Sequence, residues 1–259
     1  MKLSRYKRTS PVSYAFGATI VYELIKTHPE LITRAFLRPD IKHGEDLERI
    51  LAELKQRHVE IVESTKAFNI LGAKDNCLLA AEFKKPSPYH QINSVEPHVV
   101  LVNPSDAGNV GTIMRSAVAF GFKNLVVVEP CVDPYDPKTI RASMGAIFHL
   151  NVEFSPSFDD YNLAYGCEDW HEDPSPDDIR QCYAFMLNPE ATPLTQITPP
   201  SNNCYSLVFG NEATGLPKDF CDSEYQNNLP VYIPQSPNVD SLNLSAAASI
   251  ALYTLHQNS

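Results

Sequence analysis

The sequence predicts an α/β protein with a small α/β domain over residues 1–88 and a larger, mostly parallel α/β domain over residues 97–259. Short apolar runs alternate with helix-like segments along most of the chain, as in sheets covered by helices. The stretch KKPSPYHQINSVEP, residues 84–97, interrupts this alternation with prolines and polar residues, so we place the domain boundary there. Hydrophobic residues make up 43% of the 259 residues, enough for two cores.

The first domain reads as alternating helices and strands. Apolar spacing predicts a helix over 13–27, and four leucines and isoleucines place another over 44–58. A serine before an apolar run predicts a short helix over 64–71. Strands are expected over 32–38, 59–63 and 77–83.

The second domain is expected to have a mostly parallel sheet, because its strands are continuously apolar and separated by helices. Strands are predicted over 98–102, 124–128, 147–154, 182–187, 205–209 and 229–234. Helices are predicted over 107–122, 136–146 and 241–255. Residues 153–180 contain nine acidic residues and one arginine, which is typical of a solvated insertion or loop.

Charge is divided unevenly along the chain. The net charge is −10, but residues 1–90 hold 15 Lys and Arg against 11 Asp and Glu, while residues 91–259 hold 6 against 20. The first part could therefore meet a polyanion that the second would, on average, repel. Candidates for such contacts are Lys2, Arg5, Lys7, Arg8, Arg34, Arg38, Lys42, Lys84 and Lys85, each of which is individually more consistent with a solvated surface.

Several function classes are disfavoured by what the sequence lacks. The six cysteines are scattered, and no Cys/His zinc pattern, HExxH, GxSxG, P-loop lysine or GxGxxG after a strand occurs. We therefore expect no metal site. With no signal-like segment and no long apolar run, we expect a soluble cytoplasmic protein without a membrane partner.

Ligands of parallel α/β sheets bind beyond the carboxyl ends of the strands. Here three such ends carry glycines and polar side chains, in residues 103–121, 209–217 and 233–253. Taken singly, each has a simpler structural explanation: Asn109 could cap a helix, GNEATG could be a turn, and Ser241 or Asp240 could cap the last helix.

Together, however, GNVGTIMRSAVAFG, VFGNEATGLP and IPQSPNVDSLNLSAAASIAL resemble the three ordered motifs of the SpoU (TrmH) family of RNA ribose methyltransferases, in the SPOUT superfamily. RASMGAIFHL, residues 141–150, is similar to a further stretch of that family, and the resemblance covers residues 99–256. It implies an α/β-knot domain with a trefoil-knotted sheet, and a homodimer with its site completed across the interface. Residues 1–88 resemble the small RNA-binding domain, akin to a ribosomal protein, that often precedes this domain.

The resemblance also implies S-adenosyl-L-methionine as cofactor and a ribose 2′-hydroxyl as acceptor. Gly210, Ile233 and Leu242 match cofactor-binding positions, with Leu187 and Asn211 as further candidates. The catalytic candidates are Asn109, Arg115, Glu212, Ser241 and Asn243.

The match to the motif-one arginine gives Arg115 two alternative roles. It could grip an RNA phosphate and lower the pKa of the hydroxyl, or act as a base if its own pKa were strongly depressed. For Glu212 we consider holding the arginine, relaying a proton through water, or bonding loop amides, and favour structural support. The amides and Ser241 would fix loops, ribose and base.

Two residues depart from the family pattern. Ala107 replaces a usual proline, and Ala213 stands where glycine is common. If position 213 had a positive φ, alanine would cost about 1 kcal/mol there.

The sequence thus predicts an RNA 2′-O-methyltransferase, with ribosomal RNA slightly favoured over transfer RNA. A catalytically inactive RNA-binding protein of the same fold is the alternative, and methylation of a base or of a non-RNA substrate ranks lowest. The five polar catalytic candidates are all present, which argues against an inactive protein.

Overall fold

The computed structural model describes residues 3–39, 44–73, 76–87, 92–166, 179–188, 190–217, 220 and 228–257. The chain forms two compact units: Met1–Pro86 with Asp133–His149, and Ser87–Val132 with Leu150–Ser259. Residues 133–149 thus group with the first unit, whereas the predicted domains 1–88 and 97–259 had assigned them to the second. No helix in the described ranges is both long and apolar enough to span a bilayer.

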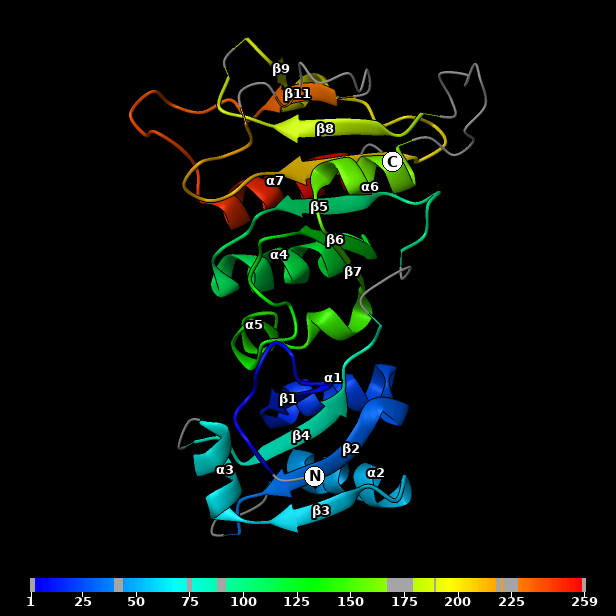
Figure 1. Ribbon diagram of the computed structural model, residues 1–259, viewed down its shortest axis with the longest axis vertical. Helices are drawn as coiled ribbons and strands as arrows, with labels where there is room; N and C mark the ends of the chain where they lie inside the picture. Colours follow the sequence, from blue (N-terminus) through cyan, green and yellow to red (C-terminus); the bar gives the residue numbers. More distant parts are fainter. Residues whose placement is uncertain are drawn as a thin grey trace. The chain divides into compact units, whose positions relative to one another are not determined.

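The first unit is built on a four-stranded sheet with the strand order β1-β4-β2-β3 (Figure 1). β4 pairs antiparallel with β1 and β2, and β2 pairs parallel with β3. The strands are β1 (Val12–Phe16), β2 (Ile32–Leu37), β3 (Glu60–Glu63) and β4 (Leu79–Lys84). The helices are α1 (Ala18–Thr27), α2 (Glu45–Gln56), α3 (Thr65–Leu71) and α5 (Pro137–Ala142), with single 3-10 turns at Pro29–Leu31 and Ala146–His149.

The helix predicted over 13–27 is wrong in its first third, because residues Val12–Phe16 form strand β1 instead. Gly17, with φ of 106°, separates the strand from α1. Pairing of β1 with β4 satisfies the strand's backbone, and this partner lies more than sixty residues away. Local apolar spacing cannot reveal such a pairing.

Residues 133–149 complete the core of the first unit. The ring of Phe148, only 4% exposed, packs edge-on against Phe83 of β4 at 5.3 Å, and the Ser13 hydroxyl donates to the Tyr135 carbonyl at 2.5 Å. The helix predicted over 136–146 ends at Ala142, because the backbone turns left-handed at Met144. The strand predicted over 147–154 begins only at Asn151.

The second unit contains a seven-stranded sheet in the order β7-β6-β5-β10-β8-β11-β9. Every recorded pairing in it is parallel, which confirms the predicted sheet type, while the trefoil knot stays a prediction. The strands are β5 (His98–Val102), β6 (Asn124–Val128), β7 (Asn151–Ser155), β8 (Gln181–Phe185), β9 (Thr192–Pro193), β10 (Tyr205–Phe209) and β11 (Asn228–Tyr232). The helices are α4 (Ala107–Ala119), α6 (Phe158–Tyr165) and α7 (Leu244–Gln257), with a 3-10 turn at Leu194–Gln196.

Strands β5, β6 and β10 are buried along their whole length, as expected for a sheet covered on both faces. Alternate valines of these strands pack with Tyr161 of α6 in one cluster. Helices α4 and α7 lie side by side, joined by a hydrogen bond of 2.7 Å between the hydroxyls of Ser116 and Ser249 (Figure 1).

The acidic segment 153–180 is only partly a loop. Its first residues belong to β7, residues 158–165 form α6, and 167–178 lie outside the described residues. Its one arginine, Arg180, is fully buried and donates to the carbonyls of Ser94, Glu96 and Tyr205, the last at 2.7 Å. A guanidinium placed among carbonyls fixes the approach to β5 and the start of β10.

We predict that Phe148→Ala lowers the free energy of unfolding by about 3–5 kcal/mol, because it empties a buried aromatic site. Urea titration of the full chain measures this. Leu163→Ala, at a side chain 60% exposed, serves as control and should change it by less than about 0.5 kcal/mol. Equal effects of the two substitutions would show that residues 133–149 do not contribute to the core.

Candidate functional site

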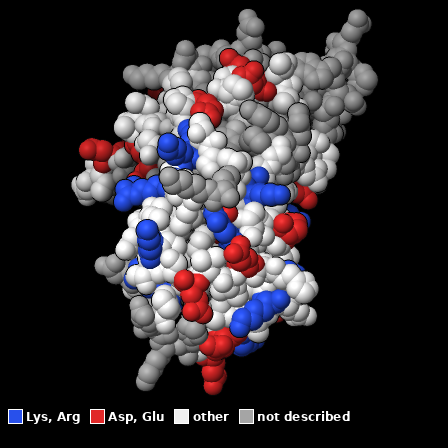
Figure 2. Space-filling model, turned by 60° about the horizontal axis from the view of Figure 1, so that its bottom comes forward, with Lys and Arg blue, Asp and Glu red and all other residues white. Residues whose placement is uncertain are grey.

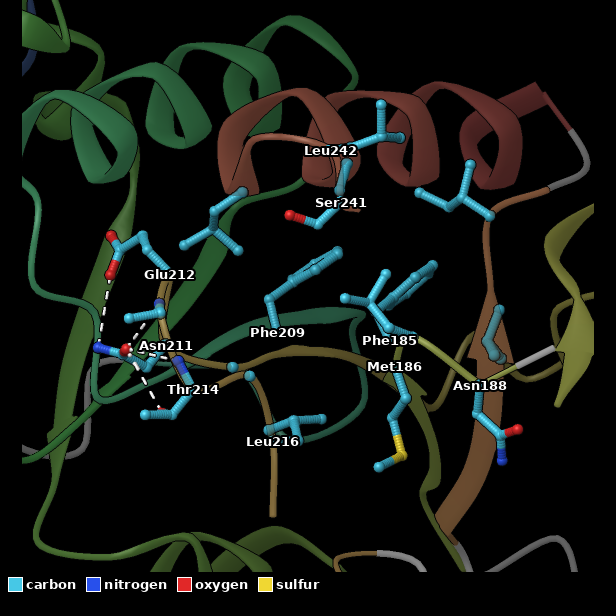
Figure 3. Close-up of a pocket in the computed structure, with 18 of the residues that line it drawn as sticks. Phe185, Met186, Asn188, Phe209, Asn211, Glu212, Thr214, Leu216, Ser241 and Leu242 are labelled. Carbon is cyan, nitrogen blue, oxygen red and sulfur yellow. Dashed lines mark hydrogen bonds between the residues drawn. The ribbon is translucent and has the colours of Figure 1, made fainter. Parts of the chain in front are cut away.

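A cavity of about 540 Å³ opens at the carboxyl ends of β8, β10 and β11. Its walls are largely apolar, and the rings of Phe185 and Phe209 stack at 4.5 Å within it. Figure 3 shows Ser241 and Leu242 on one side of these rings and Met186 and Leu216 on the other. The segments that meet here are residues 185–188, 209–216, 231–235 and 241–247.

Gly210 lets the chain turn sharply at the end of β10. A Cβ atom at this position would lie 2.3 Å from the carbonyl carbon of Gly215 and the nitrogen of Leu216, so no larger residue fits without a backbone shift. The loop closes on itself through a 2.9 Å hydrogen bond from the Gly215 amide to the Asn211 carbonyl. Gly215 itself has a φ of 67°, which favours glycine.

The side chain of Asn211 holds this loop from inside. Its oxygen accepts hydrogen bonds from the amides of Ala213 at 2.9 Å and Thr214 at 3.2 Å (Figure 3). Its nitrogen donates to the carbonyl of Asn103 at 2.8 Å, which connects the loop to the end of β5. Ala213 is not among the positive-φ residues, so alanine in place of the family's glycine is unstrained.

Glu212 binds the start of α4. Its carboxylate accepts from the Ser105 amide at 3.0 Å, the Ser105 hydroxyl at 2.7 Å and the Asp106 amide at 3.1 Å. These donors precede the helix, where a carboxylate is favoured. Within the described ranges of this single chain, bonding to loop amides is the role observed for Glu212. Holding an arginine stays a prediction.

Two opposing influences act on the pKa of Glu212. Partial burial, the larger single one, raises it, but the hydrogen bonds from Ser105 and Asn109 together outweigh burial. The pKa of Glu212 therefore lies below its usual value, and the group is ionised at neutral pH.

Asn109 and Asn243 extend this network to the C-terminal helix. The Asn109 amide nitrogen donates to Glu212 at 3.3 Å, and its oxygen accepts from the Asn243 side chain at 3.0 Å. The Asn243 oxygen also accepts from the Ser245 amide at 2.9 Å, so this residue caps α7. Asp106 caps α4, with 2.8 Å from its carboxylate to the Asn109 amide. Neither cap is the residue suggested by the sequence.

The predicted site residues divide into three groups. All five cofactor candidates line the cavity, as do Glu212 and Ser241; the five are Leu187, Gly210, Asn211, Ile233 and Leu242. Asn109 and Asn243 are joined to Glu212 by hydrogen bonds. Arg115 does not line the cavity; it lies on α4, and its exposed side chain makes no hydrogen bond or ion pair to any described residue.

Sequence reasoning missed Ser105, Asp106 and the two stacked phenylalanines. Asp106 could have been found, because an aspartate one residue before a helical pattern is a start signal. No sequence signal marks Ser105 as a partner of a residue 107 positions away. Among the described residues no group of three or more His, Cys, Asp or Glu is placed to hold a metal ion.

We predict that Glu212→Gln destabilises the protein in a pH-dependent way. A carboxyl group with a pKa lowered by folding stabilises the fold above its unfolded pKa, about 4.3, and this contribution is lost as the pH falls through the folded value. The loss of stability on substitution should therefore be present at neutral pH and shrink below about pH 4.3.

Urea titrations between neutral and acidic pH measure this difference. The control is Glu63→Gln, at an exposed glutamate whose side chain makes no hydrogen bond to a described residue. If the stability difference for Glu212→Gln stays constant across this pH range, folding does not lower the pKa of Glu212.

The similarity to known proteins covers the part of the chain that contains this site. The model of the SpoU rRNA Methylase family matches residues 96–253. The chain is 28% identical over 210 residues to rRNA methyltransferase 3A, mitochondrial, of Danio rerio, covering 68% of this chain and 48% of that protein. It is 30% identical over 160 residues to the 23S rRNA (guanosine(2553)-2'-O)-methyltransferase RlmP of Bacillus subtilis, covering 61% and 57%. The chain thus spans about half the length of these curated relatives.

Solved structures agree with the fold. The AdoMet-bound rRNA methyltransferase from Sinorhizobium meliloti superimposes with a TM-score of 0.72 at 25% identity, covering 94% of this chain and 86% of that one. The SpoU methyltransferase AviRb from Streptomyces viridochromogenes, in complex with AdoMet, gives a TM-score of 0.75 at 18% identity, with 97% and 93% covered.

Proposed function

Because the chain belongs to the SpoU rRNA Methylase family, we propose that it transfers a methyl group from S-adenosylmethionine to a ribose 2′-hydroxyl of RNA. The observation that carries the proposal is the convergence of the five predicted cofactor residues on one cavity, within the matched residues. Two solved structures of similar fold are described as AdoMet complexes, which supports the choice of cofactor.

The cavity suits a ligand with an adenine and a sugar. Its volume lies within the usual range for small-molecule sites, and the stacked rings of Phe185 and Phe209 offer an apolar wall. The turn at Gly210 brings backbone amides and carbonyls to the cavity edge, where they can bind a base. When bound, S-adenosylmethionine supplies an electrophilic methyl group on a cationic sulfur.

Arg115 is the residue that acts on the RNA. Its guanidinium is exposed and without a partner among the described residues, so it can bind a phosphate beside the target ribose. Its charge lowers the pKa of the 2′-hydroxyl and stabilises negative charge that develops on that oxygen. Glu212 is held by three donors from Ser105 and Asp106, so we assign it to loop positioning and not to proton transfer.

The first unit is proposed to dock the RNA, with ribosomal RNA as the favoured substrate. It carries 17 lysines and arginines against 13 aspartates and glutamates, whereas the second unit carries 4 against 18. Figure 2 shows basic and acidic side chains interspersed on one face, so contacts on this face would come from individual cations.

Internal bonds narrow the set of cationic candidates in the first unit. Arg34 is paired with Glu82 at 2.8 Å, Arg38 stacks on Phe68, and Lys85 bonds the Arg8 carbonyl. Arg5, Lys7 and Lys84 stay exposed, while Lys2 and Lys42 lie outside the described residues.

A homodimer is part of the proposal. Helices α4 and α7 pair, and Ile250 and Tyr253 of α7 are 41% and 50% exposed, which suits an apolar contact with a second copy. The cellular location stays a prediction, since the similar proteins include mitochondrial and bacterial ones.

The activity is tested by mass spectrometry of ribosomal RNA nucleosides. The RNA comes from cells that carry the gene and from cells in which the gene is deleted. We expect one 2′-O-methylated nucleoside to be lost on deletion and restored by purified protein with S-adenosylmethionine. RNA binding without any methylated product would support the alternative, an inactive RNA-binding protein.

We predict that Arg115→Ala lowers kcat for methyl transfer by about 10²–10³, the usual effect of removing one stabilising donor. Calorimetry should show unchanged affinity for S-adenosylmethionine, because Arg115 does not line the cavity. Arg49→Ala, at an exposed arginine of α2, is the matched control and should retain full activity. A fully active Arg115→Ala protein would remove this residue from the mechanism.

We predict that Gly210→Ala weakens binding of S-adenosylmethionine by at least about tenfold, which corresponds to about 1.4 kcal/mol. The added Cβ forces the cavity loop to move. Gly44→Ala, where a Cβ meets no atom within 4 Å, is the matched control. Calorimetry with the cofactor alone measures the affinities of the two variants. Equal affinities would show that the cavity is not the cofactor site.

A further inference from the structure

Cations are scarce in the second half of the chain, which makes their placement informative. Residues 91–259 contain six lysines and arginines, of which Lys218 lies outside the described residues. Arg180 is buried, and Lys123 lies 3.9 Å from Glu96. The other three are Arg115, Lys138 and Arg141, whose side chains are exposed and make no hydrogen bond or ion pair to described residues.

Arg141 and Lys138 lie one turn apart on α5, and Met144 follows three residues later. Lys138 and Arg141 therefore share one face of α5, whereas Met144 lies beyond the end of the helix at Ala142. Met144 is 46% exposed although it is apolar, and it has a φ of 52°. Its amide bonds the Arg141 carbonyl at 3.1 Å, so it occupies the left-handed position after the helix where glycine is usual.

A strained, exposed methionine beside free cations points to a contact surface. Non-glycine residues in left-handed conformations persist where the surroundings demand them, and they cluster at functional sites. Met144 leaves 46% of its surface exposed, so burial offsets the strain only in part. Thioether side chains, by contrast, are adaptable partners for flat rings.

The surroundings of Arg141 favour a polyanion. Its segment belongs to the unit that holds 17 of the 21 lysines and arginines. Arg38 donates to the Cys77 carbonyl at 3.0 Å, and Arg38 and Arg141 both oppose the rise that burial causes in the pKa of the Cys77 thiol. Two chain segments about a hundred residues apart therefore contribute positive charge to one region.

We propose that Arg141 and Met144 form an RNA contact, in which Arg141 binds a backbone phosphate and Met144 packs against an unpaired base. Lys138 provides a second phosphate contact one turn away. The proposal rests on the proposed RNA methyltransferase function and adds a substrate-binding site outside the cofactor cavity. RNA is favoured over a protein partner because two exposed cations without side-chain partners among the described residues precede a single exposed apolar side chain.

The test of Arg141 uses the full chain, ribosomal RNA from the deletion strain and tritium-labelled S-adenosylmethionine. For Arg141→Gln we expect the KM for RNA to rise severalfold with kcat and Tm unchanged. The slope of log KM against log salt concentration should fall by about 0.7–0.9, the value for one lost phosphate contact. Arg49→Gln is the control, because its helix begins with Glu45, Asp46 and Glu48 and should not meet RNA.

Met144→Gly separates a contact from a structural role. Glycine relieves the left-handed strain, so Tm should stay the same or rise, while the KM for RNA should increase without a change in the salt slope. A purely structural methionine would give no change in KM.

The outcomes distinguish this site from the proposed function. If the wild-type protein methylates ribosomal RNA and both variants keep its KM, the RNA contact at Arg141 and Met144 is refuted and the activity stands. A parallel fall of kcat and Tm in both variants would also refute it. If the wild-type protein neither binds nor methylates that RNA, the proposed function itself fails.

Discussion

The site depends on one carboxylate that holds three chain segments together. Glu212, at the end of β10, accepts hydrogen bonds from the residues that precede α4, and Asn109 passes the connection on to the cap of α7 at Asn243. Each donor would otherwise be an unsatisfied group at a helix start or loop. The cavity edge and the beginnings of both helices are therefore fixed by the same charge, and the family motifs have a shared physical reason.

This arrangement separates positioning from chemistry. The side chains of Glu212, Asn109 and Asn211 form hydrogen bonds with backbone groups and with one another. These bonds hold the loops in place before any ligand binds. Arg115, in contrast, is left exposed on the same helix that Asn109 anchors. A rigid helix start can thus aim a free guanidinium at a substrate, provided that the RNA comes within its reach.

The sequence predicted local features well and distant partners poorly. Apolar runs identified β5, β6 and β10, and glycine-rich strand ends located the cavity loops. Strand β1 was taken for helix because its partner β4 lies far along the chain. For Glu212 the sequence left three roles open, since no periodicity links it to Ser105. The grouping of residues 133–149 with the first unit follows from contacts such as Phe148 with Phe83, which only the folded chain brings together.

That grouping has a consequence for how the protein is made. During translation the strands of the first unit leave the ribosome well before Phe148 does. Until then, the apolar part of their sheet that Phe148 contacts stays uncovered. The linker and strands β5 and β6 must also emerge before residues 133–149 do. Nascent chains halted before residue 133 should therefore be prone to chaperone capture or proteolysis, and those that reach residue 149 should be protected.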